Sequence, residues 1–193
     1  MPSRQRAPHR TERGFTLIEL LVTISILAVI GALAAPNLRT FVVRNKVASM
    51  SNELVAALSQ GRSLAIAKNS CVSVCVASAS NSSSCAGTAA VSDYQANGWI
   101  VFRNPQCNAA STTAGTSPNV ILQQRTGESN NYTMKPTNAS WNIVMFDPRG
   151  YANLTASGKF EIVPPGTLDA SYKRIVCLDA AGRPTVRSFS SSC

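Results

Sequence analysis

The chain changes abruptly from polar to apolar residues near its start. From Phe15 to Ala35 it reads FTLIELLVTISILAVIGALAA, 21 residues with one charged side chain, Glu19. A helix rises about 1.5 Å per residue, so this segment spans about 30 Å, the thickness of the hydrocarbon core of a bilayer. The pattern therefore predicts a helix that can cross a membrane.

Apolar residues continue after this segment at helical spacing. They recur at Leu38, Phe41, Val42, Val47, Leu54, Val55, Leu58, Ala65 and Ile66. Spacings of three, four and seven residues among these positions indicate one face of a helix that continues to about Lys68. Because Pro36 lacks a backbone N–H and clashes with the preceding turn, we expect it to kink the helix, together with Gly31. The apolar stripe of the second half is expected to seat a β-sheet.

Beyond Asn69 the pattern changes to strand-like runs separated by turns. The runs are Cys71–Ala77, Gly98–Asn104, Val120–Arg125, Trp141–Phe146, Gly158–Val163, Tyr172–Leu178 and Arg183–Phe189. We therefore expect an α+β fold in which a long N-terminal helix packs on an antiparallel β-sheet domain. The Ser-, Ala-, Thr- and Asn-rich segments 77–96 and 105–118 are expected to be exposed loops.

The net charge of +9 is spread along the chain. Residues 1–14 carry four arginines against Glu12, a charge of +3, and residues 69–193 carry nine Lys or Arg against six acids, again +3. This distribution permits a local basic patch but does not require an anionic partner. The four arginines precede the apolar segment, so the positive-inside rule places residues 1–14 in the cytoplasm and the bulk of the chain outside.

All six cysteines lie beyond the predicted helix, at Cys71, Cys75, Cys85, Cys107, Cys177 and Cys193. This clustering favours disulfides in an oxidising compartment over a zinc site, since the single histidine, His9, lies before the helix. Cys71 and Cys75 are not expected to pair, because four residues of regular strand extend about 13 Å and a disulfide requires Cα atoms within about 7 Å.

No arrangement of catalytic residues is found. Beyond residue 14 the chain has no histidine, no phosphate-binding loop and no Gly-rich dinucleotide fingerprint. Asp147 and Asp179 lie in Gly- and Pro-rich stretches and are interpreted as turn formers. We expect an assembly protein, not an enzyme, without a cofactor or metal.

Glu19 does not suit a simple membrane anchor, because a carboxylate in hydrocarbon costs at least a few kcal/mol unless it is neutralised or paired. The surrounding sequence, RGFTLIE from Arg13 to Glu19, resembles the prepilin processing site of type IV pilins and type II secretion pseudopilins. The resemblance implies that prepilin peptidase cleaves after Gly14, that the new amino group of Phe15 is methylated, and that Glu19 acts in assembly. A neighbouring subunit's terminal amine can then pair with Glu19 in lipid. A protonated or snorkelling carboxyl near the interface is the alternative.

A secretory signal peptide is the competing interpretation of the same residues. Ala32, Leu33 and Ala34 match the A-x-A pattern that precedes signal cleavage. However, the apolar run is longer than a usual signal peptide's, Glu19 is left without a role, and Pro36 lies beside the cut. The prepilin hypothesis accounts for all three features.

The pilin resemblance implies a type IV pilin fold with four segments. These are a leader at 1–14, a transmembrane helix at 15–37, an amphipathic helix half at 38–68 and a disulfide-bearing β-rich domain at 69–193. The expected location is the inner membrane as a single-pass protein with a periplasmic globular domain, then a pilus or pseudopilus. The expected partners are other pilin subunits, minor pilins, prepilin peptidase and the inner membrane.

The β-rich half of the sequence narrows the resemblance to a subgroup of these pilin-like proteins. A cysteine-bearing first strand, GWIVF at 98–102, FDPRG at 146–150 and AGRP at 181–184 resemble the FimT/FimU-type minor pilins and the H-type pseudopilin of type II secretion, GspH. The likeness implies a minor pilin that primes pilus assembly or, as an alternative, a minor pseudopilin.

This resemblance also bears on the cysteines. Similar minor pilins commonly link the first strand to the following loop, which suggests Cys75 with Cys85. Closure of the carboxyl-terminal hairpin suggests Cys177 with Cys193, and Cys71 with Cys107 remain. Each bridge is expected to stabilise the domain by a few kcal/mol.

DNA is a further candidate partner, since some FimT-type pilins bind it through a GRxR motif in the terminal hairpin. Here the stretch is GRPTVR from Gly182 to Arg187, with Thr185 in place of the second arginine. On a strand Arg183 and Arg187 share one face at about 13 Å spacing, which suits phosphate contacts. The neighbouring cations that extend this patch are Lys173 and Arg174. The alternative is a solvated hairpin edge kept soluble by its charge.

Overall fold

The computed structural model describes residues 14–154, 158–166 and 170–193, without the side chains of residues 34–37. The chain divides into two units, Met1–Val42 and Val43–Cys193. Helix α1 comprises Leu17–Ala67 and contributes to both units. It ends one residue before the expected Lys68, where Asn69 adopts a positive φ of 43° and the backbone N–H of Ser70 donates to the carbonyl of Ala65. This left-handed residue closes the last turn of the helix.

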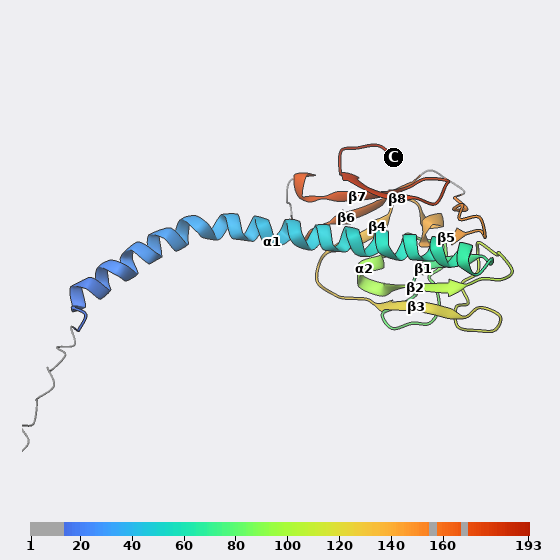
Figure 1. The fold of residues 1–193 in the computed structure, drawn as a ribbon, viewed down its shortest axis with the longest axis horizontal. Helices are drawn as coiled ribbons and strands as arrows, with labels where there is room; N and C mark the ends of the chain where they lie inside the picture. Colours follow the sequence, from blue (N-terminus) through green and yellow to red (C-terminus); the bar gives the residue numbers. More distant parts are fainter. Residues whose placement is uncertain (1–13, 155–157, 167–169) are drawn as a thin grey trace, which may run out of the picture. The chain divides into compact units, whose positions relative to one another are not determined.

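The first sheet contains the strands β1 (Val72–Val76), β2 (Gly98–Arg103), β3 (Ile121–Thr126) and β5 (Ile143–Phe146). Their order is β3-β2-β1-β5 and every pairing is antiparallel. A short helix, α2 (Tyr94–Asn97), precedes β2. The central strand β1 therefore pairs with strands that follow it in the chain on both sides (Figure 1).

The second sheet contains β4 (Thr133–Pro136), β6 (Phe160–Val163), β7 (Arg174–Leu178) and β8 (Pro184–Ser188), in the antiparallel order β4-β6-β7-β8. Two 3₁₀ helices, η1 (Ala139–Asn142) and η2 (Ala170–Tyr172), lie between strands. The described residues thus form two four-stranded sheets, where the sequence analysis expected one. It also missed β4, which is only four residues long and ends in a proline.

The second half of α1 packs against both sheets of the globular unit (Figure 1). Its fully buried side chains share one core with apolar residues of each sheet; the core includes Met50, Leu54 and Leu58 from the helix, Val74, Val101 and Val144 from the first sheet, and Phe160, Ile162 and Val176 from the second. The helix approaches β1 closely at Gly61, because a Cβ there would lie 2.7 Å from a methyl of Val74. The amphipathic stripe therefore seats the β-domain, as its spacing predicts.

A second apolar cluster covers the opposite face of the first sheet. Cys75, Ile100 and Phe102 pack there with Cys85 and Ala114, which come from the segments that connect the strands. β1 is accordingly buried along its whole length. The expectation that segments 77–96 and 105–118 are simply exposed loops is wrong at these positions, because small apolar residues within them close the core.

Three aromatic side chains lie at the junction of the two sheets. The ring of Phe160 on β6 lies 5.4 Å from that of Tyr94 and 5.3 Å from that of Trp141, both edge-on. The Tyr94 hydroxyl donates to the carbonyl oxygens of Trp141 and Asn142, 2.9 and 3.1 Å away. Complete burial raises the pKa of Tyr94 far above its usual value, so this hydroxyl stays a donor at any ordinary pH.

Charged side chains fix the helix to the first sheet at its edge. Arg125 on β3 places Nε 3.1 Å from a carboxylate oxygen of Glu53 on α1, and its guanidinium lies 4.6 Å from the ring centroid of Trp99. Lys46 and Glu128 form a second contact of 3.6 Å. Arg125 is only 17% exposed, so this arrangement is better shielded from solvent than an ordinary surface ion pair.

Candidate functional site

The predicted processing and assembly residues lie at the start of α1. Gly14 and Phe15 precede the helix, and Phe15 is 86% exposed. Thr16 caps the helix, because its hydroxyl accepts from the backbone N–H of Glu19 at 3.3 Å and its carbonyl accepts from Leu20. Glu19 lies in the first turn, where a carboxylate is favoured by the positive end of the helix dipole.

The unit Met1–Val42 leaves its apolar side chains uncovered. Within its described residues the large apolar side chains from Phe15 to Leu33 are all exposed, with Leu33 at 72%. The hydroxyls of Thr23 and Ser25 donate to helix carbonyls one turn earlier, so their polar groups are satisfied within the helix. A continuous apolar surface of this kind marks contact with lipid or another protein.

A membrane span sets requirements on the length and the hydropathy of a helix. No single described helix meets them alone, whereas Leu17–Leu33 and Leu38–Ala67 do so together as a bent pair. Pro36, the predicted kink residue, falls among residues 34–37, whose side chains lie outside the described part. The kink at Pro36 stays a prediction.

The six cysteines form three disulfides in the described part of the chain. The structure joins Cys71 to Cys107, Cys75 to Cys85, and Cys177 to Cys193, which are the pairs that the sequence analysis suggested. Cys75 and Cys85 lie inside the second apolar cluster. The third bridge holds residue 193 against β7, so the segment after β8 folds back over that strand.

The arginines of the carboxyl-terminal hairpin lie on one face. Arg183 and Arg187 line a shallow cavity of about 110 Å³ together with Thr185 and the Cys177–Cys193 bridge. Arg183 Nε lies 3.1 Å from a carboxylate oxygen of Asp179, and Arg187 donates to the carbonyl of Ser192 at 3.0 Å. Both side chains are exposed, but each already has a partner within the chain.

Asp179 organises the turn that carries Arg183. Its carboxylate accepts from the backbone N–H of Arg183 at 2.8 Å. This backbone hydrogen bond, helped by the Arg183 side chain, holds the pKa of Asp179 below its usual range. Asp147 has a similar place in the other predicted turn, where it accepts from the backbone N–H groups of Arg149 and Tyr151.

The other two candidate DNA-binding cations, Lys173 and Arg174, lie in different surroundings. Residues opposite one another in an antiparallel pair share a face, and Arg187 is opposite Ile175 whereas Arg174 is opposite Ser188. Arg174 therefore shares the face of the buried Val176 and does not extend the surface around Arg187. Lys173 instead places Nζ 5.1 Å from the ring centroid of Phe189.

Sequence reasoning missed the residue that joins the two characteristic turns. Arg62 on α1 donates from Nε to the carbonyl oxygens of Gly150 and Ala181, both 3.1 Å away. Gly150 and Gly182 have φ of +84° and +74°, and a Cβ on Gly182 would overlap the carbonyl oxygen of Gly150. The FDPRG and AGRP motifs are thus two turns packed together around one helix side chain.

Chemistry is otherwise sparse in the described residues. Within them no three His, Cys, Asp or Glu side chains are grouped so as to hold a metal ion. Apart from Glu19, their acidic side chains serve in turns and ion pairs. These turns and ion pairs are suited to holding the surface of the domain in a fixed conformation.

A long N-terminal helix whose second half packs on antiparallel sheets defines the type IV pilin fold. The family model described as Type II transport protein GspH matches residues 50–182, and the Prokaryotic N-terminal methylation motif matches residues 9–35. The chain belongs to the GspH family and is a type IV pilin-like minor pilin or pseudopilin. Pilins and pseudopilins are structural, non-enzymatic proteins.

Comparison with solved structures agrees on the fold. The type IV minor pilin FimU of Pseudomonas aeruginosa, in one crystal form, is 20% identical, with a TM-score of 0.54, and the match covers 79% of this chain and 96% of FimU. A second crystal form is 19% identical, with a TM-score of 0.50 and coverage of 75% and 95%. No curated protein matches.

Proposed function

We propose that this chain is a minor pilin that prepilin peptidase cleaves between Gly14 and Phe15, that is methylated on Phe15, and that primes assembly of a pilus or pseudopilus. Before assembly it spans the inner membrane once through residues 15–37, with the disulfide-bearing domain in the periplasm. Other pilin subunits and minor pilins are its partners. In this proposal the peptidase removes the leader at 1–14 and residues 15–37 cross the membrane. The amphipathic helix half at 38–68 carries the globular domain at 69–193.

The observation that carries this proposal is the contrast between the two halves of α1. Leu54 and Leu58 are completely buried by the chain's own sheets, whereas the apolar side chains from Phe15 to Leu33 are exposed. An apolar helix of this length needs lipid first and other helices after assembly. Glu19 is the one carboxylate in that surface, and a neighbouring subunit's terminal amine would neutralise it.

The role of Glu19 is tested by replacing it in the full-length chain. We expect Glu19→Ala and the isosteric Glu19→Gln to insert into the membrane but to be absent from sheared filaments, because both remove the charge partner. Thr23→Ala is the matched control on the same helix, since the Thr23 hydroxyl bonds only to its own helix. Normal incorporation of Glu19→Gln would contradict the proposed charge pairing.

A second candidate function is DNA binding at the carboxyl-terminal hairpin during DNA uptake. The observation that favours it is the joint lining of one cavity by Arg183, Thr185 and Arg187. The Asp179 carboxylate weakens the case, because it partly neutralises Arg183. Assembly is therefore the better-supported function.

A further inference from the structure

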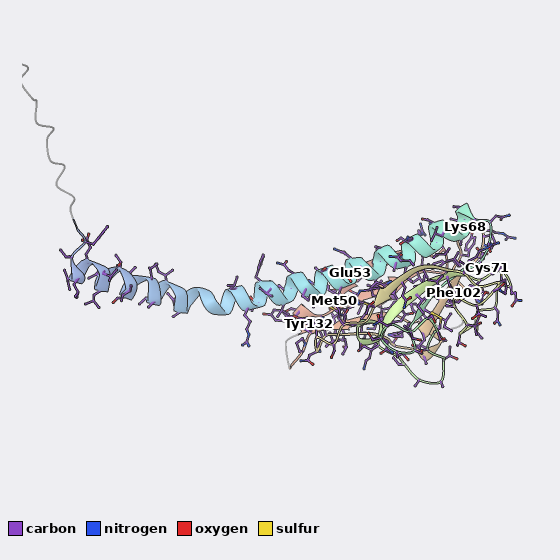
Figure 2. The ribbon with its side chains drawn as sticks, turned by 90° about the horizontal axis from the view of Figure 1, so that it is seen from below. Met50, Glu53, Lys68, Cys71, Phe102 and Tyr132 are labelled. Carbon is purple, nitrogen blue, oxygen red and sulfur yellow. A yellow bond between two sulfur atoms is a disulfide. The ribbon has the colours of Figure 1, made fainter. Side chains whose placement is uncertain are left out.

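A basic groove lies at the end of the globular unit where α1 terminates. It has a volume of about 340 Å³ and is lined by Lys68, Arg103, Val120 and Leu122. Val120 is 55% exposed although it is apolar, and Lys68 and Arg103 are also exposed. Figure 2 labels Lys68 at the end of the helix. The groove thus combines two cations with an uncovered apolar floor.

Several cations of this unit have an acidic partner, but Lys68 and Arg103, like Arg62, Arg149 and Arg187, have none among the described residues. Lys46, Arg125 and Lys135 each have a carboxylate within 4.0 Å. Among the residues that the structure describes, neither Lys68 nor Arg103 has one, and the side chain of Arg103 donates only to the hydroxyl of Ser70, at 3.4 Å. Two positive charges therefore face the groove without compensation.

The walls of the groove are held in place. The backbone N–H of Arg103 donates to the carbonyl of Val120 at 2.8 Å, and the Cys71–Cys107 disulfide joins the segments that follow Lys68 and Arg103. The pairing of β2 with β3 shifts after Val101, which leaves Leu122 without an opposite residue. Such bulges redirect side chains and are frequent beside binding sites. A surface fixed in this way loses little entropy on binding.

We propose that this groove docks an acidic, partly apolar polypeptide segment of a different pilin-like subunit. One or two carboxylates of that segment pair with Lys68 and Arg103, and an apolar side chain covers Val120. This proposal rests on the proposed function, because it requires that the chain is incorporated beside other subunits. The docking proposal identifies the groove as the contact surface and requires an acidic and an apolar side chain on the neighbouring subunit.

The chain's own acids argue against a second copy as the occupant. In the described part of Val43–Cys193, every Asp and Glu side chain already has a partner within the chain. Five form ion pairs and Asp147 accepts backbone hydrogen bonds; the five are Glu53, Asp93, Glu128, Glu161 and Asp179. A second copy would have to break one of these contacts to place any of these six carboxylates in the groove. A neighbour with an uncommitted carboxylate has no such penalty.

The test is a site-specific cross-link in the full-length chain within cells that assemble the filament. Photoreactive benzoylphenylalanine replaces Val120, and sheared filaments are irradiated and analysed by mass spectrometry. We expect a cross-link to another pilin-like subunit at a segment containing Asp or Glu. Lys68→Glu combined with Arg103→Glu should reduce its yield about fivefold or more, because two attractions become repulsions. Arg44→Glu with Lys135→Glu makes the same change in net charge at two exposed residues that do not line the groove, and should leave the yield unchanged.

Charge exchange provides the second measurement. Replacing the cross-linked neighbour's carboxylate by Lys should restore the cross-link to the Lys68→Glu/Arg103→Glu chain. Undiminished cross-linking in that double variant, or products only with a second copy, lipid or nucleic acid, overturns the proposal. If wild-type chain is absent from filaments, the proposed function fails and the docking proposal with it. If the chain is present but gives no such product, docking alone fails.

Discussion

The side chain of Arg62 on α1 donates a hydrogen bond from Nε to the carbonyl oxygen of Gly150, 3.1 Å away and 88 residues later in the chain. The same nitrogen also approaches the carbonyl of Ala181. One helix side chain therefore secures the turn after β5 and the turn between β7 and β8. The position of the terminal hairpin depends on this contact.

Arg62→Met should lower the free energy of unfolding by about 2 kcal/mol, because two partly buried carbonyls lose a charged donor. Thermal unfolding of the full-length protein in mild detergent, followed by near-ultraviolet circular dichroism, measures the change. Arg149→Met is the matched control, since Arg149 is exposed and its change should stay within about 0.5 kcal/mol. Equal effects of the two substitutions would show that Arg62 has no special role.

Gly182→Ala should destabilise the protein by about 1–3 kcal/mol more than Gly166→Ala, the range for overpacking a tight contact. Both glycines have positive φ, +74° and +82°, so both variants incur similar backbone strain. Of these two positions, only Gly182 would bring a Cβ against a backbone oxygen, that of Gly150, whereas nothing lies within 4 Å at Gly166. Equal unfolding temperatures for the two variants would contradict the close packing of the turns.

Asp179 should stabilise the hairpin only while it is ionised. Its pKa is lowered in the folded state, so its contribution is fully present above the usual carboxyl pKa, about 3.9. That contribution is lost as pH falls through the lowered folded value. The stability difference between wild type and Asp179→Asn should therefore be constant above about pH 5 and disappear in stronger acid. A difference that grows toward low pH, or a normal carboxyl pKa by NMR, would contradict this assignment.

If the hairpin binds DNA, Arg183→Ala combined with Arg187→Ala should reduce the slope of log affinity against log salt by nearly two units on duplex DNA. The full-length protein in detergent is titrated with duplex and single-stranded oligonucleotides at several salt concentrations. Circular dichroism must show an unchanged fold, since arginine stems also cover apolar surface. Absence of binding at low salt, or a double variant that binds like wild type, would leave assembly as the function.

The sequence predicts α1 and most strands because their apolar residues follow the periods of a helix and a strand. Val47, Leu54 and Leu58 lie on one helix face in the sequence and in the core. β4 escaped prediction because four residues ending in Pro136 give too short a pattern. The division into two sheets depends on pairings between distant segments, such as β1 with β5, which no local pattern encodes.

The candidate sites also differ in how far they can be predicted from the sequence. Glu19 and Gly14 stand out because a charge or a processing motif is visible in a few consecutive residues. Arg62 does not, because its partners are backbone carbonyls 88 and 119 residues away. The groove of Lys68 and Arg103 could not be predicted from the sequence either. The two cations are 35 residues apart, and no local pattern indicates that they lie together.

The central claim is that the chain is a processed pilin, and amino-terminal mass analysis of the protein isolated from membranes tests it most directly. The account predicts a chain that starts at Phe15 and carries a methyl group on its terminal amine, with Gly14→Ala accumulating as uncleaved precursor. A chain that starts at Ala35 would contradict it, because that terminus is the product of a secretory signal peptide.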